Sequence, residues 1–372
     1  MKAFLFANTD WYLYNYRLTL AETLKQQGHT IILVAPDGVF SSRIRQAGFD
    51  LRTIHLSRRG INPLEELNAI RELFRIFKQE KPDIIHNFTI KCVLYGSLAA
   101  HITRVKGVVN AITGLGYVFT RNNLFTHIAR PIVRGLYRWL LKGTAVIFQN
   151  QADMDYFFFR KLIGKKQGIL IPSSGVDTNL FTPAPAKIEQ GLVVLSARML
   201  WDKGVAEFVE AARILHQSGV KALFALVGDI DQGNPSSIPI DQLHAWEKEG
   251  VVVWWGWQDN MVDVYQRAQV VCLPSSYGEG LSKSLIEAAA CGCPLVTTDI
   301  PGCREVVQEG KNGFLVPLGD AASLAKAIRK ILKMKAHDLS AMRQASRKLA
   351  INEYALEKII SKTIIVYNQL DI

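Results

Sequence analysis

Short apolar runs alternate with longer segments of helical spacing along most of the chain. In the first half the runs are "AFLFA", "TIILVAP", "DLRTIHL", "DIIHN", "GVVNAIT" and "TAVIFQN". In the second half they are "GLVVLSA", "ALFALVGD", "VVVWWG", "VVCLPS", "PLVTTD" and "GFLVP". Short apolar strands separated by helices are typical of parallel sheets that are covered on both faces. The pattern therefore predicts an α/β fold with two series of parallel strands.

The alternation breaks around residues 172–190, in the Pro-, Gly- and Ser-rich segment "PSSGVDTNLFTPAPAKIEQG". Such composition is typical of a linker. A length of 372 residues also suits two domains. We therefore predict two Rossmann-like domains, 1–185 and 186–353, with a last helix at 354–372 that packs back on the first. Ligands bind at the carboxyl ends of such strands, so we expect the two sheets to face each other across a cleft.

Charge is distributed unevenly along the chain. Residues 1–185 hold 24 Lys and Arg against 12 Asp and Glu, a net charge of +12, whereas residues 186–372 hold 20 against 21, a net charge of −1. A basic half indicates a polyanionic or membrane partner. The first half contains no recognised nucleic-acid motif, but the charge keeps a nucleic-acid-binding protein as an alternative of a different class.

Two features bear on the compartment. The five cysteines lack zinc-type spacing and indicate reduced thiols, as in a cytoplasmic protein. The apolar run at the amino terminus is too short for a signal peptide. The sequence contains no run of about 18 apolar residues, so no membrane span is predicted.

Two carboxylates bracket the start of a predicted helix in "YGEGLSKSLIEAAACGCPLVTTD", at residues 277–299. Gly280, Leu281 and Ser282, with Ser282 as N-cap, would present backbone N–H groups that suit a diphosphate. Glu287, inside the helix, could accept two hydrogen bonds from the vicinal diol of a ribose. Glu279 lies beyond the diphosphate end, where a sugar would be. Taken alone, the two acids are equally well explained as solvated surface residues.

A second motif, "SARMLWDKGV", places Arg198 and Lys203 after a strand and before a helix of the same domain. Two cations at the carboxyl end of a strand could neutralise a diphosphate leaving group. Surface cations near a turn are common, but the two motifs together are specific.

These motifs, with "SSGVDTNLF" and "LVGDIDQGNP", resemble those of the retaining glycosyltransferases of the GT-B fold, over essentially the whole chain. The resemblance implies that Arg198 and Lys203 hold the diphosphate of a nucleotide sugar, that Glu287 binds the ribose and that Glu279 contacts the donor sugar. It also assigns base contacts to Gly256 and Trp257.

The first half is similar to bacterial enzymes that build O-antigen, capsule or N-glycan precursors on a polyprenyl diphosphate, in "PDIIHNFTIKCVLYGSLAA" and "NAITGLGYVFT". Many of these enzymes carry a His where this chain has Gly114, so the role of that His cannot be assigned to a residue of this chain. Gly114 and Gly116 could let the backbone approach the sugars closely, or form a plain tight turn.

The loop "NTDWYLYNYR" after the first strand is aromatic and lies at the predicted cleft. Tyr14 and Arg17, with Lys91 opposite, are candidates for binding the acceptor sugar or its diphosphate. Packing against the neighbouring domain is the alternative for the aromatic residues. His86, at a strand end, is expected to be a satisfied polar residue rather than a base.

A helical pattern over residues 124–142 carries Arg130, Arg134, Arg138 and Lys142 at successive i+4 positions. With the nearby aromatic residues, this is the pattern of a basic amphipathic helix, which suits an anionic membrane surface. A solvated helix face is the alternative. Arg58 and Arg59 add to the same charge.

Neither Asp-x-Asp string, at 153–155 or 229–231, is convincing as a metal site, because Asp is favoured at helix starts and in turns. We therefore expect no metal and no cofactor beyond a UDP-sugar co-substrate. The sequence predicts a cytoplasmic, peripheral-membrane, retaining glycosyltransferase that moves a hexosamine or hexose from a UDP-sugar to a lipid-linked saccharide. The same-fold alternatives are a UDP-sugar epimerase and a phosphorylase.

Overall fold

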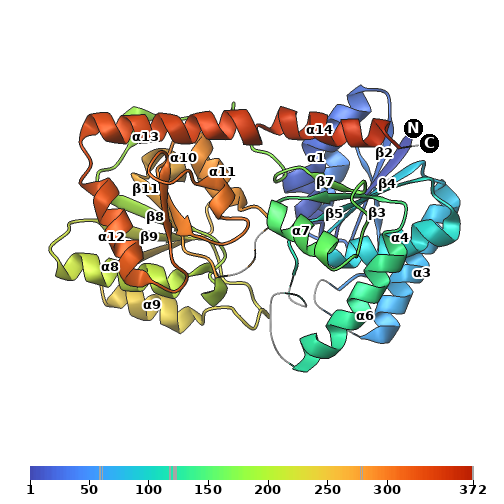
Figure 1. The fold of residues 1–372 in the computed structure, drawn as a ribbon, viewed down its shortest axis with the longest axis horizontal. Helices are drawn as coiled ribbons and strands as arrows, with labels where there is room; N and C mark the ends of the chain where they lie inside the picture. The colour runs from blue at the N-terminus through green and yellow to red at the C-terminus, as the bar shows by residue number, and fades with distance from the viewer. Residues whose placement is uncertain are drawn as a thin grey trace. The chain divides into compact units, whose positions relative to one another are not determined.

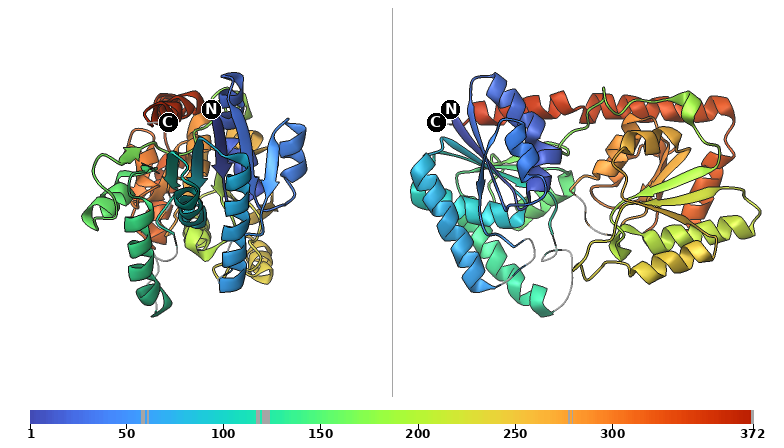
Figure 2. Two further views of the ribbon diagram at one scale, coloured as in Figure 1. Left: turned by 90° about the vertical axis from the view of Figure 1, so that its right-hand side faces the viewer. Right: turned by 180° about the vertical axis from the view of Figure 1, so that it is seen from behind.

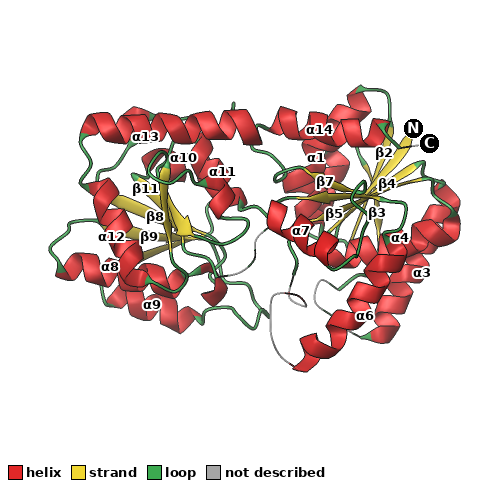
Figure 3. Cartoon of the chain, viewed as in Figure 1, coloured by secondary structure: helices red, strands yellow, loops and turns green. Residues whose placement is uncertain are grey.

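The protein consists of two compact α/β units, shown in the computed structural model of Figure 1. The structure describes residues 1–57, 60, 62–116, 119, 124–276, 278 and 280–370. One unit comprises Met1–Ser174 together with the chain from Ile359 onward, and the other comprises Gly175–Lys358. In each unit a parallel sheet is flanked by helices, as the yellow strands and red helices of Figure 3 show.

The sheet of the first unit has seven parallel strands in the order β3-β2-β1-β4-β5-β6-β7. The strands are β1 (Lys2–Phe6), β2 (Thr30–Ala35), β3 (Asp50–Thr53), β4 (Ile84–Phe88), β5 (Gly107–Ile112), β6 (Ala145–Phe148) and β7 (Gly168–Leu170). β1 and β4 are almost entirely buried, as expected of central strands covered on both faces. The order reverses between β1 and β4, which defines the switch point of a doubly wound sheet.

Among the described residues, six helices and the last helix of the chain belong to this unit. They are α1 (Asp10–Gln26), α2 (Ser41–Gln46), α3 (Pro63–Glu80), α4 (Ile90–Thr103), α6 (Leu124–Leu140), α7 (Gln151–Phe159) and most of α14 (Leu356–Asn368). Side chains of Thr9, Asn62 and Asn150 cap α1, α3 and α7 by accepting from the first-turn amides. α4 packs against both α3 and α6 (Figure 2).

The last helix is tied to the first sheet by a buried hydrogen bond. Tyr367 Oη lies 2.7 Å from Nδ1 of His86 on β4, and both side chains are about 99% buried. Burial and the nearby charge of Arg17 hold the pKa of His86 well below its usual range, so this imidazole is neutral. His86 thus has a structural partner on Nδ1, but its buried Nε2 has no hydrogen-bond partner among the described residues, so the expected satisfied polar residue is satisfied on one ring nitrogen only.

The sheet of the second unit has six parallel strands in the order β10-β9-β8-β11-β12-β13, with its switch point between β8 and β11. The strands are β8 (Leu192–Ser196), β9 (Leu223–Val227), β10 (Val253–Gly256), β11 (Val270–Leu273), β12 (Leu295–Thr298) and β13 (Gly313–Val316). The helices are α8 (Val205–Gln217), α9 (Ile240–Lys248), α10 (Met261–Arg267), α11 (Lys283–Ala290), α12 (Ala321–Leu332) and α13 (Ala336–Leu349).

The predicted linker is bound firmly to the second unit. The Val176 amide donates to the Tyr354 carbonyl at 2.8 Å, and the Arg347 guanidinium donates to the carbonyls of Thr178 and Phe181. The domain boundary predicted at 185/186 therefore falls inside the second compact unit, and the structure divides the chain between Ser174 and Gly175. The sequence pattern detected Pro and Gly in this segment but not the long-range bonds that hold it.

Candidate donor site

The loop after β8 carries Arg198 and Lys203 at the switch point of the second sheet. Lys203 ends the 3₁₀ turn η2 (Trp201–Lys203), directly before α8. Gly204 follows with φ of 73°, and a Cβ there would lie 2.0 Å from the Pro274 carbonyl oxygen, so only glycine permits this approach. The carbonyl of Asp202 accepts the amide of Ser276 at 2.9 Å. The loops after β8 and β11 are thereby fastened together.

Arg198 has a partner that the sequence analysis did not assign. Its guanidinium forms an ion pair with Asp231, in the segment after β9, and the Asp231 side chain is only 12% exposed against 45% for Arg198. Asp231 also accepts from Asn234 Nδ2 at 3.1 Å. Asp231 was weighed only as part of an Asp-x-Asp metal motif, whereas the structure makes it the counter-ion that orients Arg198.

The segment 229–238 is held against the Arg198 loop by backbone hydrogen bonds. The Met199 amide donates to the Asp229 carbonyl at 2.9 Å, and the Ile238 amide donates to the Met199 carbonyl at 3.0 Å. Gly228, with φ of 128°, lies where a Cβ would sit 2.0 Å from the Ala197 carbonyl oxygen. Asp231 is thus placed by a rigid backbone arrangement rather than by its own side chain alone.

The predicted helix start after β11 is confirmed, but one of its expected anion contacts is wrong. α11 begins at Lys283 with Ser282 in the N-cap position, but the Ser282 side chain makes no capping hydrogen bond to the first-turn amides. The Ser282 amide donates to the Gly302 carbonyl at 2.9 Å, so it is not available to a phosphate. Leu281 and Ser282 are buried, at 7% and 4% exposure. The predicted contacts from Gly280 and Leu281 stay predictions.

Glu287 lies on α11 with its side chain largely buried, at 16% exposure. Its Oε1 is 3.8 Å from Nζ of Lys283, one helical turn earlier, and Lys283 also donates to the Gly175 carbonyl. Burial raises the pKa of Glu287, and the Lys283 charge only partly offsets this effect. A carboxylate buried in this way is not the solvated helix acid of the alternative interpretation.

Glu287 also influences a buried tyrosine of α10. Tyr265 Oη donates to Ser196 Oγ at 3.0 Å, at the end of β8. Burial raises the pKa of Tyr265, and the charge of Glu287 raises it further. Tyr265 therefore links Glu287 electrostatically to Ser196 at the carboxyl end of β8.

Three other donor-site predictions have different outcomes. Glu279 lies outside the described residues, and its assigned role stays a prediction. Gly256 ends β10 with φ of 64°, and its carbonyl accepts the Gly228 amide at 2.8 Å. Trp257 follows it and is 56% exposed, with Nε1 donating to Asp259 at 2.9 Å. An exposed indole at a strand end is compatible with the predicted contact to a base.

The predicted acceptor residues of the first unit are less accessible than expected. Arg17 is only 6% exposed, donates to Tyr12 Oη at 2.8 Å and lies 4.2 Å over the Phe88 ring, and its assignment to the acceptor stays a prediction. Tyr14 is half-buried, with its ring 5.2 Å from that of Phe40. The side-chain direction toward the start of α1 explains why Arg17 turns back onto β4.

Lys91, on α4, is likewise engaged within its own unit. Its ammonium donates to the Ser57 and Gly60 carbonyls at 2.9 and 2.5 Å and pairs with Glu66 at 2.5 Å. These bonds use the three donors of a lysine, so a contact of Lys91 with an acceptor would have to replace one of them, and that contact stays a prediction.

Gly114 and Gly116 follow β5 with φ of 126° and 72°. A Cβ on Gly116 would lie 2.2 Å from Cδ1 of Ile90. The two glycines therefore serve a tight backbone turn against α4. Close approach to a sugar remains a prediction for both.

The candidate metal motifs have structural partners. Asp153 is 5% exposed and forms a reciprocal cap with Asn150 at the start of α7, with 2.8 and 3.1 Å bonds. Asp231 is paired with Arg198, as described above. Among the described residues, no group of three or more His, Cys, Asp and Glu side chains is arranged to hold a metal ion.

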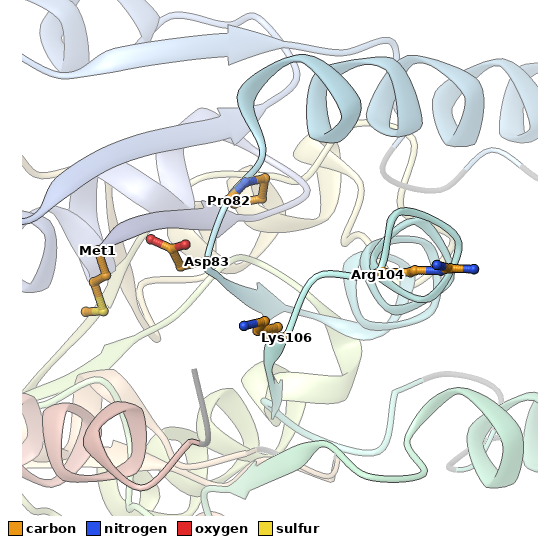
Figure 4. Close-up of a pocket in the computed structure, with 5 residues that line it drawn as sticks. All are labelled: Met1, Pro82, Asp83, Arg104 and Lys106. Carbon is orange, nitrogen blue, oxygen red and sulfur yellow. The ribbon is translucent and has the colours of Figure 1, made fainter.

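A pocket in the first unit lies away from the switch-point edge of that unit's own sheet. It is lined by Met1, Pro82, Asp83, Arg104 and Lys106, which Figure 4 shows around the starts of β1, β4 and β5. These are the amino ends of the strands, opposite the edge where doubly wound sheets bind ligands. We assign this pocket no role in the reaction.

Comparison with known proteins defines the class. Two doubly wound parallel sheets in one chain are the GT-B architecture, and Anabaena Alr3699/HepE, solved with UDP-glucose, shares the fold at TM-score 0.81 and 19% identity over 100% of both chains. A glycosyltransferase from Rickettsia africae matches at TM-score 0.79 and 19% identity, over 99% of this chain and 98% of that one. The model "Glycosyl transferase 4-like" matches residues 2–151, and the model "Glycosyl transferases group 1" matches residues 178–349. The chain belongs to the group 1 glycosyl transferases.

Curated relatives cover most of the chain. The N,N'-diacetylbacillosaminyl-diphospho-undecaprenol alpha-1,3-N-acetylgalactosaminyltransferase of Campylobacter jejuni is 28% identical over 86% of each chain. The UDP-Gal:alpha-D-GlcNAc-diphosphoundecaprenol alpha-1,3-galactosyltransferase of Escherichia coli is 24% identical, over 82% of this chain and 80% of that protein. These relatives act on undecaprenyl-diphosphate-linked acceptors. The protein is thus a glycosyltransferase, and the family gives no support to the nucleic-acid-binding alternative.

Proposed function

We propose that this glycosyltransferase moves a hexosamine or hexose from a UDP-sugar to a polyprenyl-diphosphate-linked saccharide, with retention at the anomeric carbon. The observation that supports it best is the fastening of the β8 and β11 loops, which brings the Arg198–Lys203 segment to the switch point that also bears Glu287. Cations, a helix start and a buried carboxylate are the groups that a nucleoside diphosphate needs. The names of the two relatives support the lipid-linked acceptor.

The mechanism that we infer needs no protein nucleophile. The acceptor hydroxyl attacks the anomeric carbon on the face from which UDP departs, and its proton passes to the departing diphosphate oxygen. Arg198 and Lys203 stabilise the charge that develops on the diphosphate, and the Asp231 carboxylate keeps the Arg198 guanidinium oriented toward it. Glu287 holds the ribose, and Glu279 contacts the donor sugar.

The function is tested by a donor screen with purified full-length protein and short polyprenyl-diphosphate saccharides. We expect sugar transfer from one or a few UDP-sugars and none without an acceptor. The product should keep the α configuration of the donor sugar, which proton NMR of the anomeric hydrogen measures. Conversion of a UDP-sugar to its epimer without acceptor would instead establish the epimerase alternative.

Activity is expected to persist when divalent metals are removed. The reason is that Arg198 and Lys203 supply the positive charge that a metal provides in other transferases. Initial rates should agree in EDTA and in magnesium or manganese after dialysis. A loss of activity in EDTA that manganese restores would contradict the assignment of charge neutralisation to these two residues.

A further inference from the structure

The helix α6 exposes a row of apolar side chains. Ile128, Ile132, Leu136 and Trp139 are 61%, 60%, 36% and 53% exposed, and we name these four residues the α6 apolar strip. At about 100° per residue, their positions fall within an arc of about 80° on the helix. A helix face in contact with water normally carries polar residues. A continuous apolar strip on such a face therefore marks an interaction surface.

A neighbouring helix contacts the strip. The ring of His101, near the end of α4, lies 5.5 Å from the Trp139 ring in an edge-on contact. The next residue, Ile102, is 53% exposed. The strip therefore contacts the end of α4, where a further apolar side chain, Ile102, is exposed.

The basic side chains of α6 occupy a different arc and are tied to the protein. Arg134 donates to Tyr156 Oη of α7 at 2.6 Å, and Arg138 donates to the Arg160 carbonyl at 3.1 Å. Arg130 is half-buried, and Lys142 lies in the turn beyond the end of α6. The four predicted cations are therefore not equivalent, because Arg138 and Lys142 are exposed and Arg130 and Arg134 are half-buried, and their membrane role stays a prediction. The outward face consists of the apolar strip, with Arg134 and Arg138 along one side.

The part of the chain that contains the strip is strongly basic. Residues 101–166 contain 11 Lys and Arg against two Asp, a net charge of +9 out of +11 for the whole chain. Asp153, one of the two acids, is buried. The exposed cations of α4, of the end of α7 and of the turns that follow them are Arg104, Lys106, Arg160, Lys161, Lys165 and Lys166.

We propose that the α6 apolar strip enters the boundary between headgroups and acyl chains of an anionic bilayer, with the exposed cations of this part of the chain on the headgroups. An apolar strip beside a basic one is the pattern of helices that lie in a membrane interface. Aliphatic Ile128, Ile132 and Leu136 offer nothing to a nucleic-acid phosphate. A second copy of this chain would bring the same positive charge against itself. The apolar strip and the positive charge together favour a lipid surface over a nucleic acid or a second copy of the chain.

This inference rests on the proposed function in one respect only: a lipid-linked acceptor lies in a membrane, where an enzyme attached to the membrane surface can bind it. The test therefore measures binding without any sugar substrate. Full-length protein is sedimented with vesicles of phosphatidylcholine alone and of phosphatidylcholine mixed with phosphatidylglycerol. The variant is Ile128→Ser/Ile132→Ser. The control is Val39→Ser/Leu180→Ser, which removes two apolar residues that are 82% and 57% exposed elsewhere on the chain.

We expect the Ile128→Ser/Ile132→Ser variant to bind mixed vesicles at least about tenfold more weakly than the wild type, because two side chains no longer leave water. The control variant should bind as the wild type does. Both should keep the wild-type thermal midpoint, since the replaced side chains are exposed. Wild-type binding should also be stronger to mixed vesicles than to phosphatidylcholine alone and should weaken with salt.

Three results would overturn the proposal. Undiminished vesicle binding by the strip variant would mean that the cations alone attach the protein. A loss of self-association in the strip variant, seen by analytical ultracentrifugation without lipid, would make the strip an interface between copies. Equal loss of binding in the control variant would mean that any exposed apolar residue suffices.

The failure of the proposed function has a separate signature. Transfer to a short, water-soluble acceptor should be unchanged in the strip variant, because the donor residues lie in the other unit. If the wild type binds vesicles through the strip but transfers no sugar to any acceptor, the inference stands and the proposed function fails. If the wild type transfers sugar but does not bind vesicles, the proposed function stands and the membrane inference fails.

Discussion

Replacing Arg198 or Lys203 by alanine is expected to lower kcat/KM for the sugar donor by about 10²–10³-fold, the usual effect of removing one group that stabilises developing charge. Arg198 is oriented by Asp231, and the Lys203 loop is fastened to the end of β11 through Gly204 and Asp202. The measurement is steady-state kinetics with varied donor, together with UDP binding by calorimetry.

The matched control is Arg213→Ala. Arg213 lies on α8 in the same unit and forms surface ion pairs with Glu210 and Glu249, so its loss should change kcat/KM less than about twofold. Arg198→Lys should recover only part of the activity, because an ammonium cannot reproduce the bidentate contact of a guanidinium. Near wild-type kinetics in both alanine variants would remove the diphosphate role from these residues.

Asp231 provides an internal check on the same prediction. If Asp231 orients Arg198, Asp231→Asn should raise KM for the donor less than Asp231→Ala does, since asparagine keeps an acceptor oxygen for the guanidinium. In the background of Arg198→Ala, the two Asp231 variants should have no additional effect. Additive losses would show that Asp231 acts independently of Arg198.

Glu287→Gln is expected to weaken UDP binding by about tenfold or more, because hydrogen bonds to a charged carboxylate are stronger than those to an amide. Glu279→Ala should instead lower turnover and leave UDP affinity nearly unchanged, since that residue is assigned to the sugar. Calorimetry with UDP and single-turnover rates separate the two effects. Glu210→Gln, an exposed acid on α8, is the control and should change neither quantity.

The same Glu287→Gln substitution is expected to leave the unliganded protein as stable as the wild type, or more stable, at neutral pH. Burial raises the pKa of Glu287, so the native state keeps its proton over a pH range in which the unfolded chain has lost it. That difference makes wild-type stability fall as pH rises from the ordinary glutamate pKa through the raised one. The glutamine variant lacks this contribution, and its stability should depend less on pH in that window.

Thermal midpoints measured without nucleotide, from acid to neutral pH, test this sign. A glutamine variant that is markedly less stable than the wild type at neutral pH would show that the ion pair with Lys283 outweighs the cost of burial. Loss of UDP binding with retained stability would mark Glu287 as a residue kept for function at the expense of the fold.

The strand pattern could be predicted because parallel strands are buried on both faces. Runs such as "DIIHN" and "VVCLPS" have no polar alternation, and they form β4 and β11. β7 was not predicted. It has only three residues, Gly168–Leu170, and pairs on one side with β6, so neither its length nor its composition distinguishes it from a loop.

The candidate site was predictable where one local motif carries the chemistry. The Ser282 N-cap position and the start of α11 follow from the Gly-Leu-Ser spacing. The partner of Arg198 could not be predicted, because Asp231 is 33 residues away in sequence and meets it only through the pairing of segments after β8 and β9. The hydrogen bond from the Ser282 amide to the Gly302 carbonyl could not be predicted either, because the two residues are distant in sequence.

The sequence by itself determined the α/β class, the two sheets and the positions of the donor-site motifs, because strand burial, helix capping and glycine turns are local properties of the chain. Only the tertiary structure decided which side chains remain available. It buried Arg17 against Phe88, used the donors of Lys91 on Glu66 and two carbonyls, and tied Arg134 and Arg138 to the α7 region. Helical spacing shows which residues share an arc, but whether that arc faces water or protein depends on elements packed from elsewhere in the chain.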